Sequence, residues 1–261
     1  MGYKLIAADL DHTLLRDDGT VSEFTKKTIV RCMDAGVGFT FATGRMYCSA
    51  QPIAQMLGIQ LPLITYQGAL LKDTAGNVLY ALHLPQEVAG EIEEILRGSK
   101  LHYNIYSDGE LYFSTFGQRF LDYARHIGVK PLAVPSVLGE LPVTQFGVFA
   151  EPEAISLLQQ SIEKRFADSV HTIVTGGRFL EICHPLAQKS YGLARLADHL
   201  GIDAEEIVAI GDNNNDLDML RYAGLGVAVG NAVSAAKLAA QRLTASNDED
   251  GVARLIEELV L

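Results

Sequence analysis

The sequence predicts an α/β protein, with a doubly wound, Rossmann-like parallel-sheet core that is interrupted by an inserted α+β cap domain. Short apolar runs that end near glycine alternate with stretches of helical period, which is the pattern of a parallel sheet covered on both faces. This rhythm changes near Pro85 and resumes after Pro185. We therefore expect the core to comprise residues 1–83 and 186–261, and the insertion to comprise residues 84–185.

The first part of the core is expected to begin with a strand over residues 4–9. A helix over 22–35 follows, because Ser22 is a suitable N-cap and Gly36 a suitable end. Turn residues at 73–77 predict a hairpin between two apolar runs. The other elements expected here are a strand over 38–43, a helix over 46–57 and a strand over 62–66.

The insertion is expected to combine helices with pairs of strands. Each pair is joined by a strong turn, SDGE at 107–110 and Gly176-Gly177. The predicted helices cover 86–98, 117–127 and 153–167, and the predicted strands cover 102–106, 111–115, 144–150, 171–175 and 179–183.

The chain is expected to return to the core after His184-Pro185. Gly201 marks the end of the first helix of this part. The predicted helices cover 189–200, 215–223, 232–242 and 251–259, and the predicted strands cover 206–212 and 225–230.

Composition narrows the possible functions. A hydrophobic content of 48% and a charged content of 20% are ordinary for a globular protein. The net charge of −11 argues against a nucleic acid or an anionic membrane as a partner. The first residues lack the pattern of a signal peptide, and the three cysteines form no CxxC pair, so we expect a cytoplasmic protein.

Acidic and small polar residues stand at the ends of the predicted core strands. Ligands of open α/β sheets bind beyond the carboxyl ends of the strands, so these side chains are expected to meet in one crevice. Lys189, at the start of a predicted helix, would join them. The residues at the strand ends are Asp9, Asp11, Thr43, Gly44, Arg45, Asp212 and Asp216.

Two carboxylates this close predict a ligand. In an extended chain Asp9 and Asp11 share a face while Leu10 packs away. Without a cation the two acids cannot both ionise freely, and one of them would retain its proton. Mg²⁺ typically takes one or two carboxylates together with substrate phosphate, for which Asp9 and Asp212 are suitable. A phosphate would need donors and positive charge, which the Thr43 hydroxyl, the Gly44 N–H and the Lys189 ammonium could supply.

Four motifs in order resemble those of the haloacid dehalogenase-like (HAD) phosphohydrolase superfamily. They are DLDHTLL at 9–15, TGR at 43–45, Lys189, and GDNNND at 211–216. The long insertion, together with NDEDGVA at 247–253, is similar to the Cof-type subgroup of bacterial sugar-phosphate and cofactor phosphatases. Any one motif is weak, but all four in order are highly specific.

The resemblance implies a Mg²⁺-dependent phosphatase that forms an aspartyl-phosphate. Asp9 would be the nucleophile, and Asp11 would protonate the leaving oxygen and later activate water. The inserted segment would be the cap that selects substrate. The implied metal residues are Asp9, Asp11 through its backbone carbonyl, Asp212 and a supporting Asp216. The implied phosphate-binding residues are Leu10, Thr43, Gly44, Lys189 and Asn215.

The sequence departs from the family pattern at two places. His12 stands where the family usually has glycine, and Gln67-Gly68-Ala69 stands where relatives commonly show Asn-Gly-Ala. The histidine puts a close backbone approach at that position in question.

Single residues also admit simpler interpretations. Asp9 and Asp11 could form only a turn, and Lys189 alone resembles any surface lysine. Asn215 is expected to cap a helix, and Arg45 could be solvated or salt-bridged, so Arg45 is not counted as catalytic.

Two other functions stay open on the same scaffold, a phosphomutase or phosphotransferase and a catalytically idle regulatory module. The expected partner is a small phosphorylated metabolite, either a sugar phosphate or a phosphorylated cofactor. The turns at 107–110 and 175–178, including Arg178, are candidates to reach its leaving group. The expected assembly is a monomer or a weak homodimer.

Overall fold

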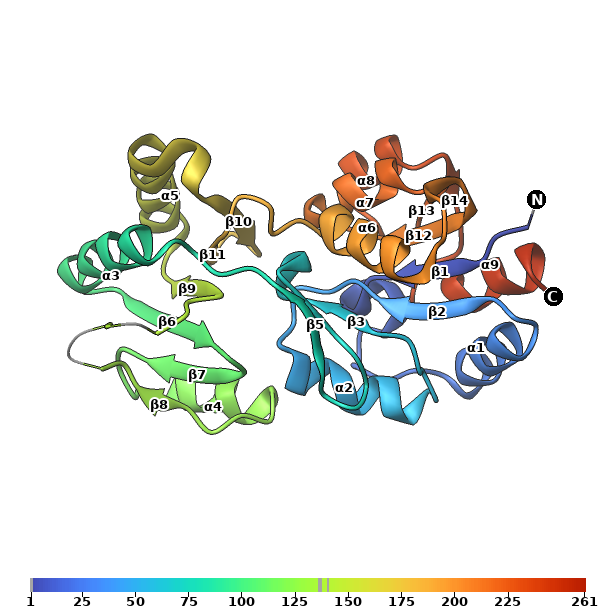
Figure 1. Ribbon diagram of the computed structural model, residues 1–261, viewed down its shortest axis with the longest axis horizontal. Helices are drawn as coiled ribbons and strands as arrows, with labels where there is room; N and C mark the ends of the chain where they lie inside the picture. Colours follow the sequence, from blue (N-terminus) through green and yellow to red (C-terminus); the bar gives the residue numbers. More distant parts are fainter. Residues whose placement is uncertain (1, 136–137, 140) are drawn as a thin grey trace. The chain divides into compact units, whose positions relative to one another are not determined.

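The computed structural model describes residues 2–135, 138–139 and 141–261 of the 261-residue chain. These residues divide into two compact units. The core unit contains the residues up to Tyr80 together with Gln188–Leu261, and the inserted unit contains Ala81–Ala187 (Figure 1). The α/β class with a parallel core sheet and an inserted sheet region is confirmed.

The core unit is built on a parallel sheet of strand order β14-β13-β12-β1-β2. Leu5 of β1 pairs with Ile207 on one side and with Gly38 on the other. Every residue of β1 is buried, as expected for a central parallel strand. The strands are β1 Leu5–Ala8, β2 Gly38–Phe41, β12 Ile207–Gly211, β13 Leu225–Ala228 and β14 Arg242–Leu243.

Helices cover both faces of this sheet. The helices α6, α7 and α8 pack one after another, whereas α1 packs against α9 (Figure 1). Ser22 caps α1 as predicted, since its Oγ accepts a hydrogen bond from the Thr25 N–H at 3.0 Å. The helices are α1 Glu23–Asp34, α2 Tyr47–Met56, α6 Lys189–Leu200, α7 Leu217–Tyr222, α8 Ser234–Ala239 and α9 Gly251–Leu259.

A small sheet of order β3-β4-β5 completes the core unit. Ile64 of β3 forms a parallel bridge with Ala42, so the residues after β2 and β3 lie beside one another. The hairpin predicted at 73–77 joins β4 to β5. The three strands are β3 Leu63–Thr65, β4 Leu70–Lys72 and β5 Val78–Ala81.

The prediction of one helix over 232–242 is wrong. Helix α8 ends at Ala239, and Arg242 then pairs with Val227 as part of β14. The Gln241 N–H donates to the Gly226 carbonyl at 2.9 Å, and the Gln241 Oε1 accepts from the Gly226 N–H at 2.6 Å. Ala240, Gln241 and Arg242 favour helix, but pairing with the sheet edge overrides this local propensity.

The inserted unit has one six-stranded sheet of order β10-β11-β9-β6-β7-β8. Its core forms where α3 and α5 pack on the sheet, around Phe146, Val148 and Leu180. Helix α4 lies at β6, where Phe120 stacks on His102. The strands are β6 His102–Ser107, β7 Glu110–Phe113, β8 Leu132–Ala133, β9 Gln145–Phe149, β10 His171–Thr175 and β11 Phe179–Cys183; the helices are α3 Gln86–Ser99, α4 Gln118–His126 and α5 Pro152–Phe166.

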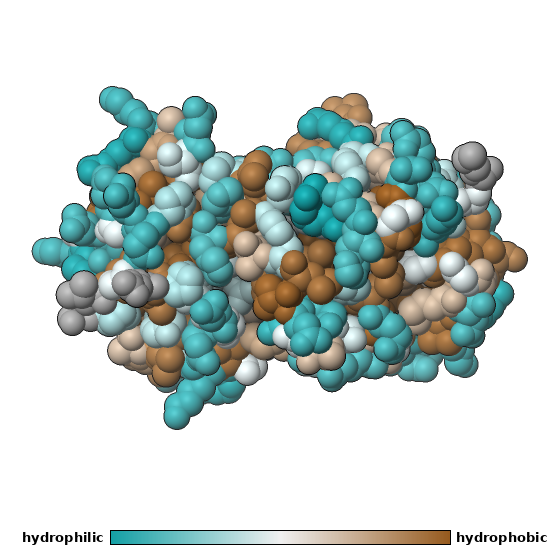
Figure 2. Space-filling model, viewed as in Figure 1, coloured by the Kyte–Doolittle hydropathy of each residue, from teal (hydrophilic) through white to brown (hydrophobic). Residues whose placement is uncertain are grey.

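The surface is mixed in character. Figure 2 shows hydrophilic side chains over much of the visible face, with hydrophobic side chains between them. The most exposed large hydrophobic residues, Leu157 and Leu238, lie on different helices. Among the helices of the described residues, none has the length and hydropathy needed to cross a membrane.

Candidate functional site

Asp9 follows β1 directly, at the carboxyl edge of the core sheet. Its N–H donates to the Ile210 carbonyl of β12 at 2.9 Å, and its residue surface is only 6% exposed. Burial raises the pKa of Asp9 well above its ordinary value, against the opposing charge of Lys189. The carboxylate therefore depends on its neighbours to stay ionised.

Lys189 supplies a buried positive charge to Asp9. Its Nζ lies 2.7 Å from Asp9 Oδ1 and 2.6 Å from Asp216 Oδ1. Burial alone would lower the pKa of Lys189, but the carboxylates of Asp216 and Asp9 outweigh burial and raise it. A lysine is buried only when it is paired, so the interpretation of Lys189 as a surface residue is excluded.

Asp212 and Asp216 come from the turn that follows β12. Asp212 accepts a hydrogen bond from the Thr13 Oγ1 at 2.7 Å, and burial raises its pKa. Both oxygens of Asp216 are engaged, Oδ1 by Lys189 and Oδ2 by the N–H groups of Asp212 and Asn213 at 2.9 Å. Asp216 is therefore an organiser of the turn.

The three acids fit a divalent cation. One oxygen each from Asp9, Asp212 and Asp216 lie within 4.8 Å of one another. Three buried carboxylates face one ammonium, and burial makes surplus negative charge costly. Carboxylate oxygens are the ligands that Mg²⁺ prefers. Because Asp216 is already engaged, Asp9 and Asp212 are the better candidates for direct ligands.

Asp11 lies in the turn that follows β1, two residues after Asp9. Its carboxylate is held by Arg45, with Nε to Oδ2 at 2.8 Å and Nη2 to Oδ1 at 2.5 Å. Burial works to raise the pKa of Asp11, but the hydrogen bonds and charge of Arg45 outweigh it and lower the pKa. Of the two simple interpretations of Arg45, the structure shows the salt bridge.

The turn after β1 covers Leu10–Leu14, where the sequence had allowed a turn at Asp9 and Asp11 only as the simpler interpretation. His12 adopts a φ of 59°, in the left-handed region. Glycine would enter this region without strain, whereas a residue with a Cβ, such as histidine, does so at a cost of roughly 1–2 kcal/mol. The Asn231 Nδ2 donates to the His12 carbonyl at 2.7 Å, and the His12 Nδ1 lies 3.3 Å from Asp17 Oδ1. The histidine thus takes the conformation of the usual glycine.

The candidate phosphate-binding residues occupy neighbouring turns of the core unit. Thr43 is buried, its N–H donates to the Ile64 carbonyl at 2.9 Å, and its Oγ1 accepts from the Arg45 N–H at 3.2 Å. The Asn215 Nδ2 donates to the Gln67 Oε1 at 3.1 Å. The Leu10 side chain packs into the core, so only its backbone is available to a ligand.

The predicted capping role of Asn215 is wrong. Asn213 begins this turn instead, and its Oδ1 accepts from the Asn214 N–H at 2.8 Å. The side chain of Asn215 donates to Gln67 instead of capping α7, which begins at Leu217.

Three residues of this site were given no catalytic or binding role from the sequence alone. Thr13 binds Asp212, Arg45 binds Asp11 and Gln67 binds Asn215. Thr13 stands within the first motif, and Gln67 follows a predicted strand, so both positions carried a signal. Their partners could not be read from the sequence because each contact joins distant segments.

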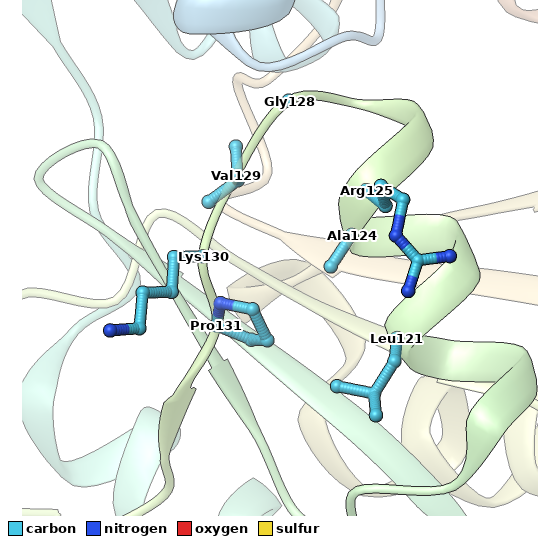
Figure 3. A pocket seen from close by; sticks show the side chains of 7 residues that line it. All are labelled: Leu121, Ala124, Arg125, Gly128, Val129, Lys130 and Pro131. Atoms are coloured by element: carbon cyan, nitrogen blue, oxygen red, sulfur yellow. The ribbon is translucent and has the colours of Figure 1, made fainter.

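The candidate turns of the inserted unit carry no such cluster. Arg178 is half exposed, and its Nη1 donates to Glu151 Oε1 at 2.6 Å. A hollow of about 420 Å³ lies at the end of α4 (Figure 3). The side chains of Arg125 and Lys130 point apart there, and Arg125 pairs with Asp122 at 2.6 Å. Its lining residues include no carboxylate: Leu121, Ala124, Arg125, Gly128, Val129, Lys130 and Pro131.

Known proteins are similar in sequence to this chain over most of its length. A 5-amino-6-(5-phospho-D-ribitylamino)uracil phosphatase of Bacillus subtilis is 34% identical over 97% of this chain and 96% of its own. An HMP-PP phosphatase of Serratia proteamaculans is 33% identical over 88% of this chain and 85% of its own. A solved haloacid dehalogenase-like hydrolase from Bacteroides thetaiotaomicron superposes with a TM-score of 0.89 at 28% identity, covering 98% of this chain and 99% of that one.

The family model of haloacid dehalogenase-like hydrolases matches residues 6–256. This range includes all four motifs that carried the resemblance. The family and its Cof-type subgroup are therefore confirmed as the sequence predicted. The chain belongs to the haloacid dehalogenase-like hydrolases.

Proposed function

We propose that the protein is a Mg²⁺-dependent phosphatase that hydrolyses a small phosphorylated metabolite through an aspartyl-phosphate on Asp9. The observation that carries this proposal is the buried Asp9 carboxylate, paired with Lys189 at 2.7 Å beside Asp212. The names of the similar phosphatases from Bacillus subtilis and Serratia proteamaculans support the substrate class, a phosphorylated metabolite. The scattered cysteines support a cytoplasmic location.

The residues divide the reaction into two steps. In the first, an oxygen of Asp9 attacks phosphorus, the bond from phosphorus to the leaving oxygen breaks, and Asp11 gives that oxygen a proton. In the second, Asp11 takes a proton from water, whose oxygen attacks phosphorus and releases Asp9 and inorganic phosphate. A bound Mg²⁺, held by Asp9 and Asp212, would neutralise charge on the phosphoryl group. Lys189 offsets negative charge throughout.

Arg45 bears on how Asp11 acts. It occupies both oxygens of Asp11, and about half of the Asp11 side-chain surface is exposed. Beside Arg45 this group is a carboxylate, so Asp11 must leave the pair and take up a proton before it can protonate a leaving oxygen. The geometry supports Arg45 as the group that holds Asp11 between the two steps.

Asp11→Asn should separate the two steps. Asparagine keeps the size of the side chain but can neither donate a carboxyl proton nor act as a base. p-Nitrophenolate leaves without a proton, so Asp11→Asn should release one nitrophenol per site in a burst and then turn over slowly. A sugar phosphate should scarcely react. Asp9→Asn should give no burst; a burst that survives in it would remove Asp9 as the nucleophile.

The inserted segment, residues 84–185, is our candidate for the specificity element of this enzyme. In open α/β enzymes the core sets the chemistry, so an added domain is a natural place for substrate choice. Replacing the segment by a short linker should leave a foldable core that hydrolyses p-nitrophenyl phosphate with little discrimination among sugar phosphates, flavin mononucleotide and pyridoxal phosphate. Unchanged selectivity would assign substrate choice to the core.

A further inference from the structure

The turn that follows β3 has a backbone conformation that side chains normally avoid. Tyr66 and Gln67 have φ values of 51° and 56°, in the left-handed region, and Gly68 follows at 93°. Consecutive non-glycine residues of this kind persist only where their surroundings hold them, and such residues gather at functional sites. The contacts of this turn should therefore reveal its use.

Backbone hydrogen bonds fix this turn against the turn that follows β2. The Tyr66 N–H donates to the Arg45 carbonyl, and the Gln67 N–H donates to the Thr43 carbonyl, both at 3.1 Å. Thr43 is one of the candidate phosphate-binding residues. A displacement of Gln67 would therefore also shift the backbone of Thr43.

The other side of the turn lies against the start of α6. A Cβ on Gly68 would stand 2.0 Å from the carbonyl oxygen of Gln188, the residue before Lys189. Only glycine allows this approach, so the turn is also set against the segment that carries Lys189.

The side chain of Gln67 is buried between two further candidate phosphate-binding residues. Its residue surface is 3% exposed. A Cβ on Gly44 would lie 2.3 Å from the Gln67 Nε2, so the carboxamide fills the space beside this glycine. The Gln67 Oε1 accepts a hydrogen bond from the Asn215 Nδ2 at 3.1 Å.

We propose that Gln67 is a positioning residue of the phosphate pocket. By accepting one N–H of the Asn215 amide it fixes which way that amide faces, and the second N–H on Nδ2 is then oriented for a phosphate oxygen. Its carboxamide also fills the space beside Gly44, which a leucine of similar volume would fill as well. This inference rests on the proposed phosphatase function.

Inhibition by inorganic phosphate tests the proposal. The inhibition constant Ki, together with kcat and KM on p-nitrophenyl phosphate, is measured for wild type, Gln67→Leu, Asn215→Ala and the double variant. Gln67→Leu should raise Ki about tenfold. The double variant should have the same Ki as Asn215→Ala alone, because Gln67 acts through Asn215. Thermal unfolding reports whether each variant is folded.

Gln60→Leu is the matched control. Gln60 is exposed on the same unit, and its Nε2 donates to the Gly58 carbonyl at 3.1 Å. Because this contact does not involve the candidate phosphate-binding residues, the Gln60→Leu variant should have the Ki of wild type. If Gln67→Leu does not fold, Gln67→Met replaces it, because methionine has a similar length but lacks the amide oxygen that accepts from Asn215, so the same rise in Ki is expected.

The outcomes separate this inference from the proposed function. A wild type that phosphate does not inhibit would contradict both. A wild type that is inhibited, with an unchanged Ki in the Gln67 variants, overturns the inference alone. Additive effects of Gln67→Leu and Asn215→Ala would also overturn it, because they would show that Gln67 does not act through Asn215.

Discussion

Each unit of this molecule buries a group of polar side chains, and the two groups differ in charge. The acid–lysine cluster of the core unit consists of Asp9, Asp212, Asp216 and Lys189. The histidine chain of the inserted unit runs from His102 through Asn104 and Tyr106 to Tyr123, with Thr115 on the other side of His102.

The histidine chain is neutral, and both ring nitrogens of its histidine have a hydrogen-bond partner. The His102 Nδ1 and Nε2 each lie 2.8 Å from a partner, Thr115 Oγ1 and Asn104 Oδ1. Burial lowers the pKa of His102 to about 4 and raises the pKa of Tyr106, so both are uncharged at neutral pH. A satisfied network of this kind rigidifies a fold.

The charges of the acid–lysine cluster do not balance, since it holds three carboxylates and one ammonium, which pairs with Asp9 and Asp216. Burial raises the pKa of both Asp9 and Asp212. Such a cluster is costly unless a ligand supplies the missing positive charge. Burial alone therefore does not identify a reactive site, whereas an imbalance of buried charge does.

The largest expected effect comes from Lys189→Met. Loss of the ammonium leaves Asp9 and Asp216 without compensation, so we expect kcat/KM to fall at least about 1,000-fold and the free energy of unfolding to fall by about 3–5 kcal/mol. The measurements are turnover of p-nitrophenyl phosphate and urea unfolding. Adding Asp216→Asn should restore part of the stability and none of the activity. Recovery of activity in that double variant would show that Lys189 is needed only to neutralise Asp216.

Removal of the metal should come next. Dialysis against EDTA should lower activity more than about 100-fold, and added Mg²⁺ should restore activity and raise the unfolding temperature. Asp212→Asn should abolish that temperature shift, whereas Asp122→Asn, an exposed acid of the inserted unit, should keep it. Full activity after exhaustive chelation would refute the metal assignment.

The histidine chain should respond to pH. In the unfolded chain His102 has a pKa near 6.5, against about 4 when folded. The unfolded state therefore binds more protons between these values, and the free energy of unfolding should fall by about 2 kcal/mol as pH drops from 6.5 to 4. Hydrogen exchange at β6 measures this loss.

His102→Gln keeps polar contacts but does not titrate, so it should flatten the pH dependence at β6. His184→Gln is the control. Burial lowers the pKa of His184 as well, but His184 is not part of the histidine chain of hydrogen bonds. An equal flattening by both variants would mean that the dependence does not arise in the histidine chain.

Arg178→Ala should have the smallest effect. The pair with Glu151 is exposed on both sides, so the free energy of unfolding should change by less than about 0.5 kcal/mol. The KM for p-nitrophenyl phosphate should also be unchanged. A KM for sugar phosphates that rises severalfold would instead assign Arg178 to the leaving group.

Local patterns predicted the elements better than their contacts. Helix α6 and strands β10 and β11 have the predicted bounds because their apolar period and flanking glycines are local signals. The strand order of the core and the edge strand β14 depend on pairing between distant segments. In the site, the motifs named Asp9, Asp212 and Lys189, but the burial of Lys189 and the contacts of Gln67 arise only when three turns meet.

The position of β1 has a consequence for how the protein is made. The first strand of the chain lies between β2 and β12, and its Leu5 pairs with Ile207. At roughly 5–20 residues per second, the ribosome completes Ala81–Ala187 about 1–5 seconds before it completes β12, and pairing of such distant segments is slow. A nascent chain therefore carries Asp9 without the lysine and acids that surround it later. Chemistry becomes possible only when the last part of the chain has been synthesised.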